Sequence, residues 1–215
     1  AELFQDVERL AGALQAMGVQ KGDHIAVSLP NWYEFYVVFL AIVKSGATIV
    51  PFNTAYKIDE IHYILQNSRA KVFFTTAENI RKFEGVEPVF QTVEHIVLVR
   101  ETDQRQLTLE KLLQQKLTFI KPYIEPSEDV AIILYTSGTT GRPKGAMLTH
   151  GNLYSNARDV ATYLGINIDD RVITTLPVFH VFALTVAVNA PLMKGATLLL
   201  VPRFSPAEVF AVAAE

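Results

Sequence analysis

The sequence predicts an α/β fold, a layered, largely parallel β-sheet flanked by helices. Short runs rich in β-branched and aromatic residues alternate with helix-like stretches along almost the whole chain, which is typical of consecutive βαβ units. Several short runs are almost continuously apolar, as in VAIILYT at 130–136, and such strands are usually covered by helices on both faces of a sheet. Half of the 215 residues are hydrophobic, which is enough for a large core.

Seven runs are predicted as strands from their apolar and β-branched composition. They are HIAVSL (24–29), ATIVPF (47–52), AKVFFTT (70–76), HIVLV (95–99), VAIILYT (130–136), RVITTL (171–176) and ATLLLV (196–201). A further short strand is expected at GAMLT (145–149), directly before a helix.

Helical spacing appears in the stretches between the strands. The chain opens on such a pattern, in which Leu3, Val7, Leu10, Ala11 and Leu14 share one face. Further helices are predicted near 31–45, 57–68, 107–116, 151–164 and 180–193, with a capped helix beginning at Ser205.

The two most apolar runs, 35–43 and 181–188, are well short of the roughly 20 residues that a membrane helix needs. We therefore predict that both are buried helices. Helical spacing also favours core packing over a ligand site for a group of five aromatic residues. These are Trp32, Tyr33, Phe35, Tyr36 and Phe39.

Composition excludes several classes of function. Nineteen Lys and Arg against 22 Asp and Glu, with a net charge of −3, argue against nucleic-acid binding. Cysteine is absent, which excludes disulfides and thiolate chemistry and fits a cytoplasmic protein. No secretory signal or transmembrane segment is visible. Asp169, Asp170 and Arg171 precede a strand as a solvated turn, so no protein metal site is predicted.

An internal boundary is predicted at KPYIEPSED (121–129), where two prolines and four charged residues interrupt the pattern before an apolar strand. Neither end of the chain has the signals of a natural terminus, and residues 1–215 are expected to be an incomplete N-terminal domain.

The stretch YTSGTTGRPKGAMLT at 135–149 is too poor in side-chain volume to pack a core. Its glycines, including Gly145, permit left-handed backbone and close approach to a ligand, and its hydroxyls and single lysine suit phosphate. We predict a polyphosphate-binding loop; a flexible surface turn is the alternative. The predicted binding residues are Thr136, Ser137, Gly138, Thr139, Thr140, Gly141 and Lys144.

The spacing excludes the P-loop of nucleotide triphosphatases. Counted from Gly138, the position that requires glycine holds Pro143, and Lys144 precedes Gly145 instead of Ser or Thr. The next element also reads as a strand, whereas a P-loop opens a helix. No G-x-G-x-x-G dinucleotide fingerprint is present.

TSGTTGRPKG at 136–145 resembles, residue for residue, the phosphate-binding signature of the adenylate-forming superfamily, which comprises acyl-CoA and aryl-CoA synthetases, luciferases and adenylation domains. The resemblance covers essentially the whole chain. THGNL (149–153) and LPVFHVF (176–182) look most like fatty acyl-CoA synthetases, with aryl ligases close behind.

The resemblance implies an acid–thiol ligase that activates a carboxylate with ATP, releases pyrophosphate and forms a thioester with coenzyme A. Lys144 would hold the β- and γ-phosphates, with Mg²⁺ sharing the charge. His180 matches the family histidine beside the acyl-binding pocket and is assigned a substrate-positioning role; a core histidine is the alternative. The other four histidines are given no function, and His150 is expected to be structural beside Thr149 as a helix N-cap.

Several alternatives stay open. An aryl acid, or a carrier protein as acyl acceptor, uses the same loop, and a non-catalytic binding module is possible from another class. Ala183 stands where the family usually has glycine, so the preferred length of the substrate's acyl chain stays open. The family's adenine- and ribose-binding segments and lid lysine have no counterpart here, so the chain alone is expected to be inactive. The expected location is cytoplasmic, with peripheral association at the inner membrane face as an option.

Overall fold

The computed structural model describes residues 2–83, 90–101, 105–136 and 143–214. Strands and helices alternate through them, as predicted. In chain order the elements are α1 (Glu2–Ala16), β1 (His24–Val27), α2 (Tyr33–Lys44), β2 (Thr48–Pro51), α3 (Ile58–Ser68), β3 (Val72–Thr75), α4 (Ala77–Arg81), β4 (His95–Leu98), α5 (Leu109–Gln114), β5 (Val130–Thr136), β6 (Lys144–Thr149), α6 (His150–Tyr163), β7 (Arg171–Thr174), α7 (Val181–Ala183), the π-helix η2 (Leu184–Asn189), α8 (Ala190–Lys194), β8 (Thr197–Leu200) and α9 (Pro206–Ala213).

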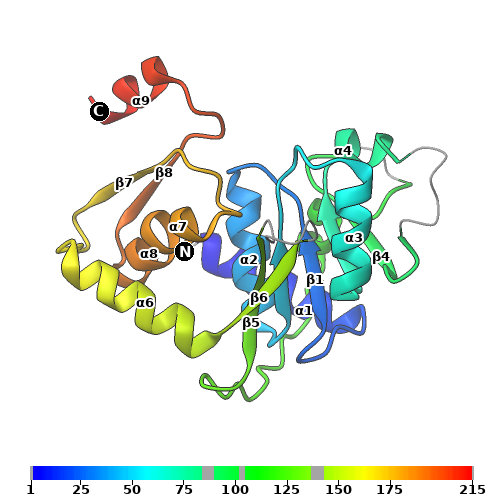
Figure 1. The fold of residues 1–215 in the computed structure, drawn as a ribbon. Helices are drawn as coiled ribbons and strands as arrows, with labels where there is room; N and C mark the ends of the chain where they lie inside the picture. The colour runs from blue at the N-terminus through cyan, green and yellow to red at the C-terminus, as the bar shows by residue number, and fades with distance from the viewer. Residues whose placement is uncertain (1, 84–89, 102–104, 137–142, 215) are drawn as a thin grey trace.

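Six strands form the main sheet in the order β4-β3-β1-β2-β5-β6 (Figure 1). All pairs in it are parallel except β5 with β6, which run antiparallel. The prediction of a largely parallel sheet is therefore confirmed.

Helices cover both faces of this sheet, and the alternation of side chains along each strand supplies both layers of core. Ile25 and Val27 of β1 pack with α1 and α2, whereas Ala26 between them packs with α3. All three residues are fully buried. A strand buried on both faces has no polar positions to spare, which explains the continuous apolar runs in the sequence.

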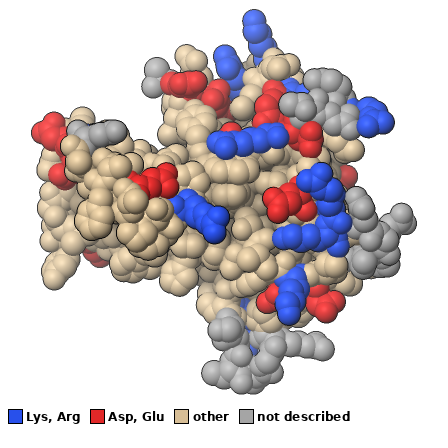
Figure 2. Space-filling model, turned by 90° about the horizontal axis from the view of Figure 1, so that it is seen from above, with Lys and Arg blue, Asp and Glu red and all other residues tan. Residues whose placement is uncertain are grey.

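The last two strands, β7 and β8, form a separate parallel pair. They lie with α6, α8 and α9 to one side of the main sheet (Figure 1). Seen from above, charged side chains of both signs are interspersed over the main-sheet half of the molecule, and the other half is mostly uncharged (Figure 2). The sequence predicts both strands but gives no sign that they leave the main sheet.

Several local predictions are confirmed. Of the five aromatic residues predicted to pack in the core, Phe35, Tyr36 and Phe39 are buried and Trp32 is partly buried against it; the prediction was wrong for Tyr33, which is 36% exposed. The Thr149 hydroxyl accepts a bond from the Asn152 amide at 3.2 Å and caps α6. The short helix α4 was not predicted, because five residues are too few to show helical spacing.

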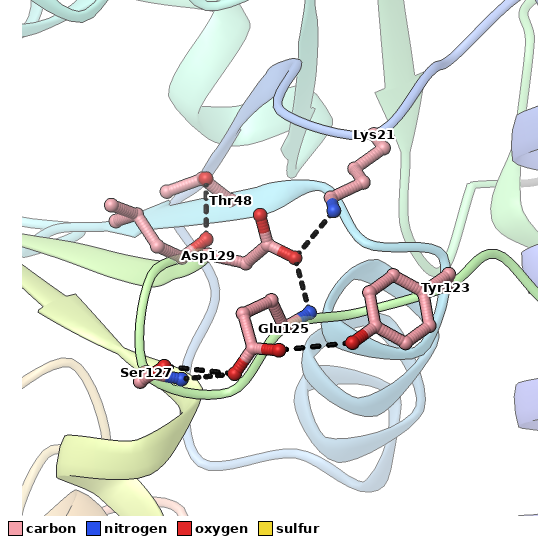
Figure 3. Close-up of polar contacts among 7 residues, drawn as sticks. Lys21, Thr48, Tyr123, Glu125, Ser127 and Asp129 are labelled. Atoms are coloured by element: carbon pink, nitrogen blue, oxygen red, sulfur yellow. Dashed lines mark hydrogen bonds and ion pairs between the residues drawn. The ribbon is translucent and has the colours of Figure 1, made fainter.

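The segment at 121–129 has no regular secondary structure, and its polar side chains bond to one another and to Lys21, which precedes β1 (Figure 3). Lys21 and Asp129 form an ion pair at 2.5 Å, and the same carboxylate accepts the Glu125 amide at 2.7 Å. The Glu125 carboxylate in turn accepts bonds from the hydroxyls of Tyr123, at 2.9 Å, and Ser127, at 2.8 Å. A domain boundary within this segment remains a prediction.

Candidate functional site

A β-hairpin carries the predicted phosphate-binding loop. The register of β5 and β6 pairs Thr136 with Lys144, and both residues are exposed. The predicted strand, short strand and helix are confirmed in that order as β5, β6 and α6. The structure thus brings together the first and last predicted binding residues. The other five, Ser137, Gly138, Thr139, Thr140 and Gly141, lie outside the described residues.

Two tyrosines fasten the base of this hairpin to α3. The Tyr63 hydroxyl donates to the Pro143 carbonyl at 3.0 Å, and the Tyr135 hydroxyl donates to Oδ1 of Asn67 at 2.6 Å. The two rings meet edge to face at 6.4 Å. Burial, aided by the neighbouring Tyr63, raises the pKa of Tyr135 to about 12, so its hydroxyl stays a donor at neutral pH. No motif marks these residues in the sequence.

Gly145 serves packing rather than a left-handed turn. The sequence predicts positive φ and close approach to a ligand here, but Gly145 lies inside β6 and is not among the glycines with positive φ. A Cβ at this position would lie 2.7 Å from Cγ2 of Ile133 and 3.3 Å from the Tyr135 ring. The expectation of positive φ was wrong for this residue, and an added side chain would clash with its neighbours on β5; close approach to a ligand stays a prediction.

His180 caps the helical segment that follows β7. Its Nδ1 accepts the Phe182 amide at 3.3 Å, and its carbonyl accepts the Leu184 amide at 3.0 Å. The side chain is exposed, so the alternative of a core histidine is wrong. Val181 and Phe182 are also about half exposed, at 48% and 56%, which corrects the prediction that 181–188 is wholly buried. They form the first turn of the helix at the rim of a cavity.

The helix beyond His180 contains a π-helical stretch, η2. Its last wide hydrogen bond runs from the Ala190 amide to the Thr185 carbonyl, and Pro191 follows without an N–H. The Ala187 carbonyl, four residues before the proline, accepts the Thr174 hydroxyl at 3.1 Å. Thr174 thereby ties η2 to β7. π-Helical turns occur often at functional sites, yet nothing in the sequence spacing predicted this one.

A cavity of about 470 Å³ lies between β6, α6 and the start of η2. Its size is within the range of small-molecule sites. Lys144 therefore lies at one end of β6, and Leu148, near the other end, lines the cavity. Four apolar residues and five polar ones line it: Leu148, Leu153, Val181 and Leu184 with Asn152, Ser155, Asn156, Asp159 and Thr185.

Among the described residues, no group of three or more His, Asp or Glu side chains is placed to hold a metal ion. In the same part of the chain, no helix combines the length and hydropathy that spanning a bilayer requires.

Comparison with known proteins gives the family. A family model described as AMP-binding enzyme matches residues 1–215. The chain belongs to the AMP-binding enzyme family. Its six-stranded α/β architecture is that of the N-terminal domain of adenylate-forming enzymes.

Two curated relatives have the same percentage of residues identical to this chain. Crotonobetaine/carnitine–CoA ligase of Citrobacter koseri is 33% identical over 212 residues, which are 95% of this chain and 41% of the relative. Long-chain-fatty-acid–CoA ligase FadD13 of Mycobacterium tuberculosis is 33% identical over 218 residues, covering all of this chain and 42% of the relative. The chain thus spans about two fifths of the curated relatives that it matches.

A solved N-terminal domain of FACL13 from Mycobacterium tuberculosis superposes with a TM-score of 0.84 at 30% identity, covering 99% of this chain and 52% of that one. The chain is therefore homologous to the N-terminal portion of AMP-forming acid–CoA ligases, a family that uses ATP and CoA as substrates.

Proposed function

We propose that the protein containing this chain is an ATP-dependent fatty acid–CoA ligase. A carboxylate oxygen attacks the α-phosphorus of ATP, the bond to pyrophosphate breaks, and an acyl-adenylate forms. The thiol of CoA then attacks the acyl carbon, and AMP leaves as the thioester forms. The observation that carries this proposal is the pairing of Thr136 with Lys144 at the base of the signature loop in a chain of this family.

Lys144 is suited to bind the phosphates. The first step brings one anion to another, so its barrier is lowered by charge stabilisation and positioning and needs no protein nucleophile. An exposed ammonium at the end of β6 offers that charge, and the Thr136 hydroxyl opposite it offers a donor. The five loop residues between them remain predicted ligands. Mg²⁺ would enter with the nucleotide and share its charge.

The cavity beside His180 is the proposed site of the acid. Leu148, Leu153, Val181 and Leu184 give it apolar surface for a hydrocarbon chain, and His180 precedes the two of these that lie on the following helix. His180 does not itself line the cavity, but it is adjacent in the chain to Val181, which does, and its exposed imidazole is able to orient a carboxylate by hydrogen bonding. His180 is proposed to position the substrate, not to form a covalent intermediate.

Other acid substrates are outcomes of the exchange test, which does not distinguish the acyl acceptor. The polar side of the cavity, with Asn152 and Asn156, also suits an aryl or short polar acid, and one relative is named for carnitine. A carrier protein in place of CoA would leave the first step unchanged. A cytoplasmic location, with peripheral membrane association as the alternative, belongs to the same proposal.

The test is carboxylate-dependent exchange between ATP and pyrophosphate by the full-length protein, with fatty, aryl and short polar acids. We expect exchange with fatty acids and a fall on the order of 100-fold in Lys144→Ala. Lys194→Ala, which removes a lysine from the end of α8, is the matched control and should behave as wild type. No exchange with any acid by folded protein would favour a non-catalytic binding module.

A further inference from the structure

Asn31 links the two sheets through backbone contacts close to His180. It lies between β1 and α2 and is 4% exposed. Its Nδ2 donates to the Leu176 carbonyl at 2.8 Å, and its Oδ1 accepts the Val178 amide at 3.0 Å. One side-chain amide therefore bonds to an acceptor 145 residues away and to a donor 147 residues away in the chain.

Within the part of the chain that the structure describes, the segment held by Asn31 pairs with no strand. β7 ends at Thr174 and α7 begins at Val181, so the backbone between them lacks regular hydrogen bonds. Val178 is fully buried, and its N–H would lose its partner without the Asn31 amide. A buried unpaired N–H is strongly disfavoured, so removing Asn31 should make this segment leave its position.

His180 follows Val178 by two residues and moves with it. The His180 amide donates to the Pro177 carbonyl at 3.0 Å, and the His180 carbonyl accepts the first bond of the helix. The turn at 177–180 is thus fixed on one side by Asn31 and on the other by the helix. A displacement of about 1 Å at a reacting group can cost on the order of 100-fold in rate.

We infer that Asn31 is a positioning residue for the carboxylate-binding step, acting through His180; this rests on the function proposed above. Its amide sets where the imidazole lies relative to the acid. Asn31 itself does not touch the substrate in this inference.

The experiment compares full-length Asn31→Ala with Asn79→Ala. Asn79 is a matched control because it is also a buried asparagine, at 3% exposure, bonded to Ser28 and Thr75 and not to the 176–178 segment. We expect kcat/KM for the acid to fall about 10- to 100-fold in Asn31→Ala, with KM for ATP changed less than about twofold. Asn79→Ala should keep kcat/KM for the acid within about threefold.

A double variant separates positioning from general destabilisation. If Asn31 acts through His180, adding Asn31→Ala to His180→Ala should lower kcat/KM by less than about threefold further. Equal losses in both backgrounds, or an equal loss in Asn79→Ala, would overturn the inference. Asn31→Asp retains the acceptor for the Val178 amide and serves if the alanine variant does not fold.

Hydrogen exchange tests the contact without relying on activity. In Asn31→Ala, amides in a peptide spanning 175–183 should exchange at least about tenfold faster than in wild type, with peptides of β1 and β3 unchanged. Unchanged exchange at 175–183 would overturn the inference even with an active enzyme. An inactive wild-type enzyme whose Asn31→Ala variant exchanges faster would refute the proposed function and retain the contact.

Discussion

At the scale of single residues, His150 makes folding sensitive to mild acid. Burial lowers the pKa of His150, helped by Lys21 and opposed by Asp129, and its buried Nε2 has no hydrogen-bond partner among the described residues. A folded pKa below the ordinary value near 6.5 means that the unfolded chain binds the proton more readily. Stability is thus greatest above about pH 6.5 and falls as the pH drops towards the folded pKa.

We therefore expect the unfolding free energy of the 215-residue chain, measured in denaturant at pH 7.5 and 5.5, to fall over this range by less in His150→Gln than in wild type. Asp129→Asn removes the attraction that favours the imidazolium and should steepen the loss. An identical pH dependence in wild type and His150→Gln would show that this imidazole is not responsible.

The residue scale also shows what the signature could and could not reveal. It gave Thr136 and Lys144, which the hairpin brings face to face, because backbone pairing follows directly from a strand–loop–strand order. It misattributed Gly145, whose constraint comes from Ile133 on the neighbouring strand. Asn31 has no local pattern at all, since its partners are 145 and 147 residues distant.

At the scale of elements, the π-helix depends on a proline and a threonine together. Pro191 cannot donate to the Ala187 carbonyl, and the Thr174 hydroxyl does so instead. Thr174 is fully buried, so Thr174→Val, which has nearly the same shape, should cost about 1–2 kcal/mol through the lost bond. Denaturant unfolding of the chain measures this directly.

Pro191→Ala supplies the control by double-mutant cycle. Alanine at 191 restores an N–H able to reach the Ala187 carbonyl, so Thr174→Val should cost less in this background than alone. Additive losses would mean that the hydroxyl and the proline act independently. Helical spacing alone predicted a regular helix at 180–193; only a contact with β7, distant in sequence, shows how that helix departs from regularity.

At the scale of the whole molecule, the sequence predicted which segments form strands better than how those strands divide between two sheets. All seven strands predicted from composition exist, because each is rich in apolar and β-branched residues, although β7 and β8 are only partly buried. Their separation into a six-stranded and a two-stranded sheet depends on which strands pair, and pairing is decided by packing between distant segments. Which strands lie at the edge of each sheet was accordingly the least predictable part of the fold.

The less charged half of the molecule carries large exposed apolar side chains. Ile168, Phe204 and Phe210 are 65–75% exposed, and α9 buries no residue. Apolar surface of this kind favours association with other apolar surface.

We expect the isolated 215-residue chain to self-associate with increasing concentration in sedimentation velocity, and the double variant Phe204→Lys with Phe210→Lys to shift it towards monomer. Phe4→Lys, at a residue 64% exposed on α1, is the matched control. A chain that stays monomeric at all concentrations, or equal shifts from both changes, would show that this face is not what associates.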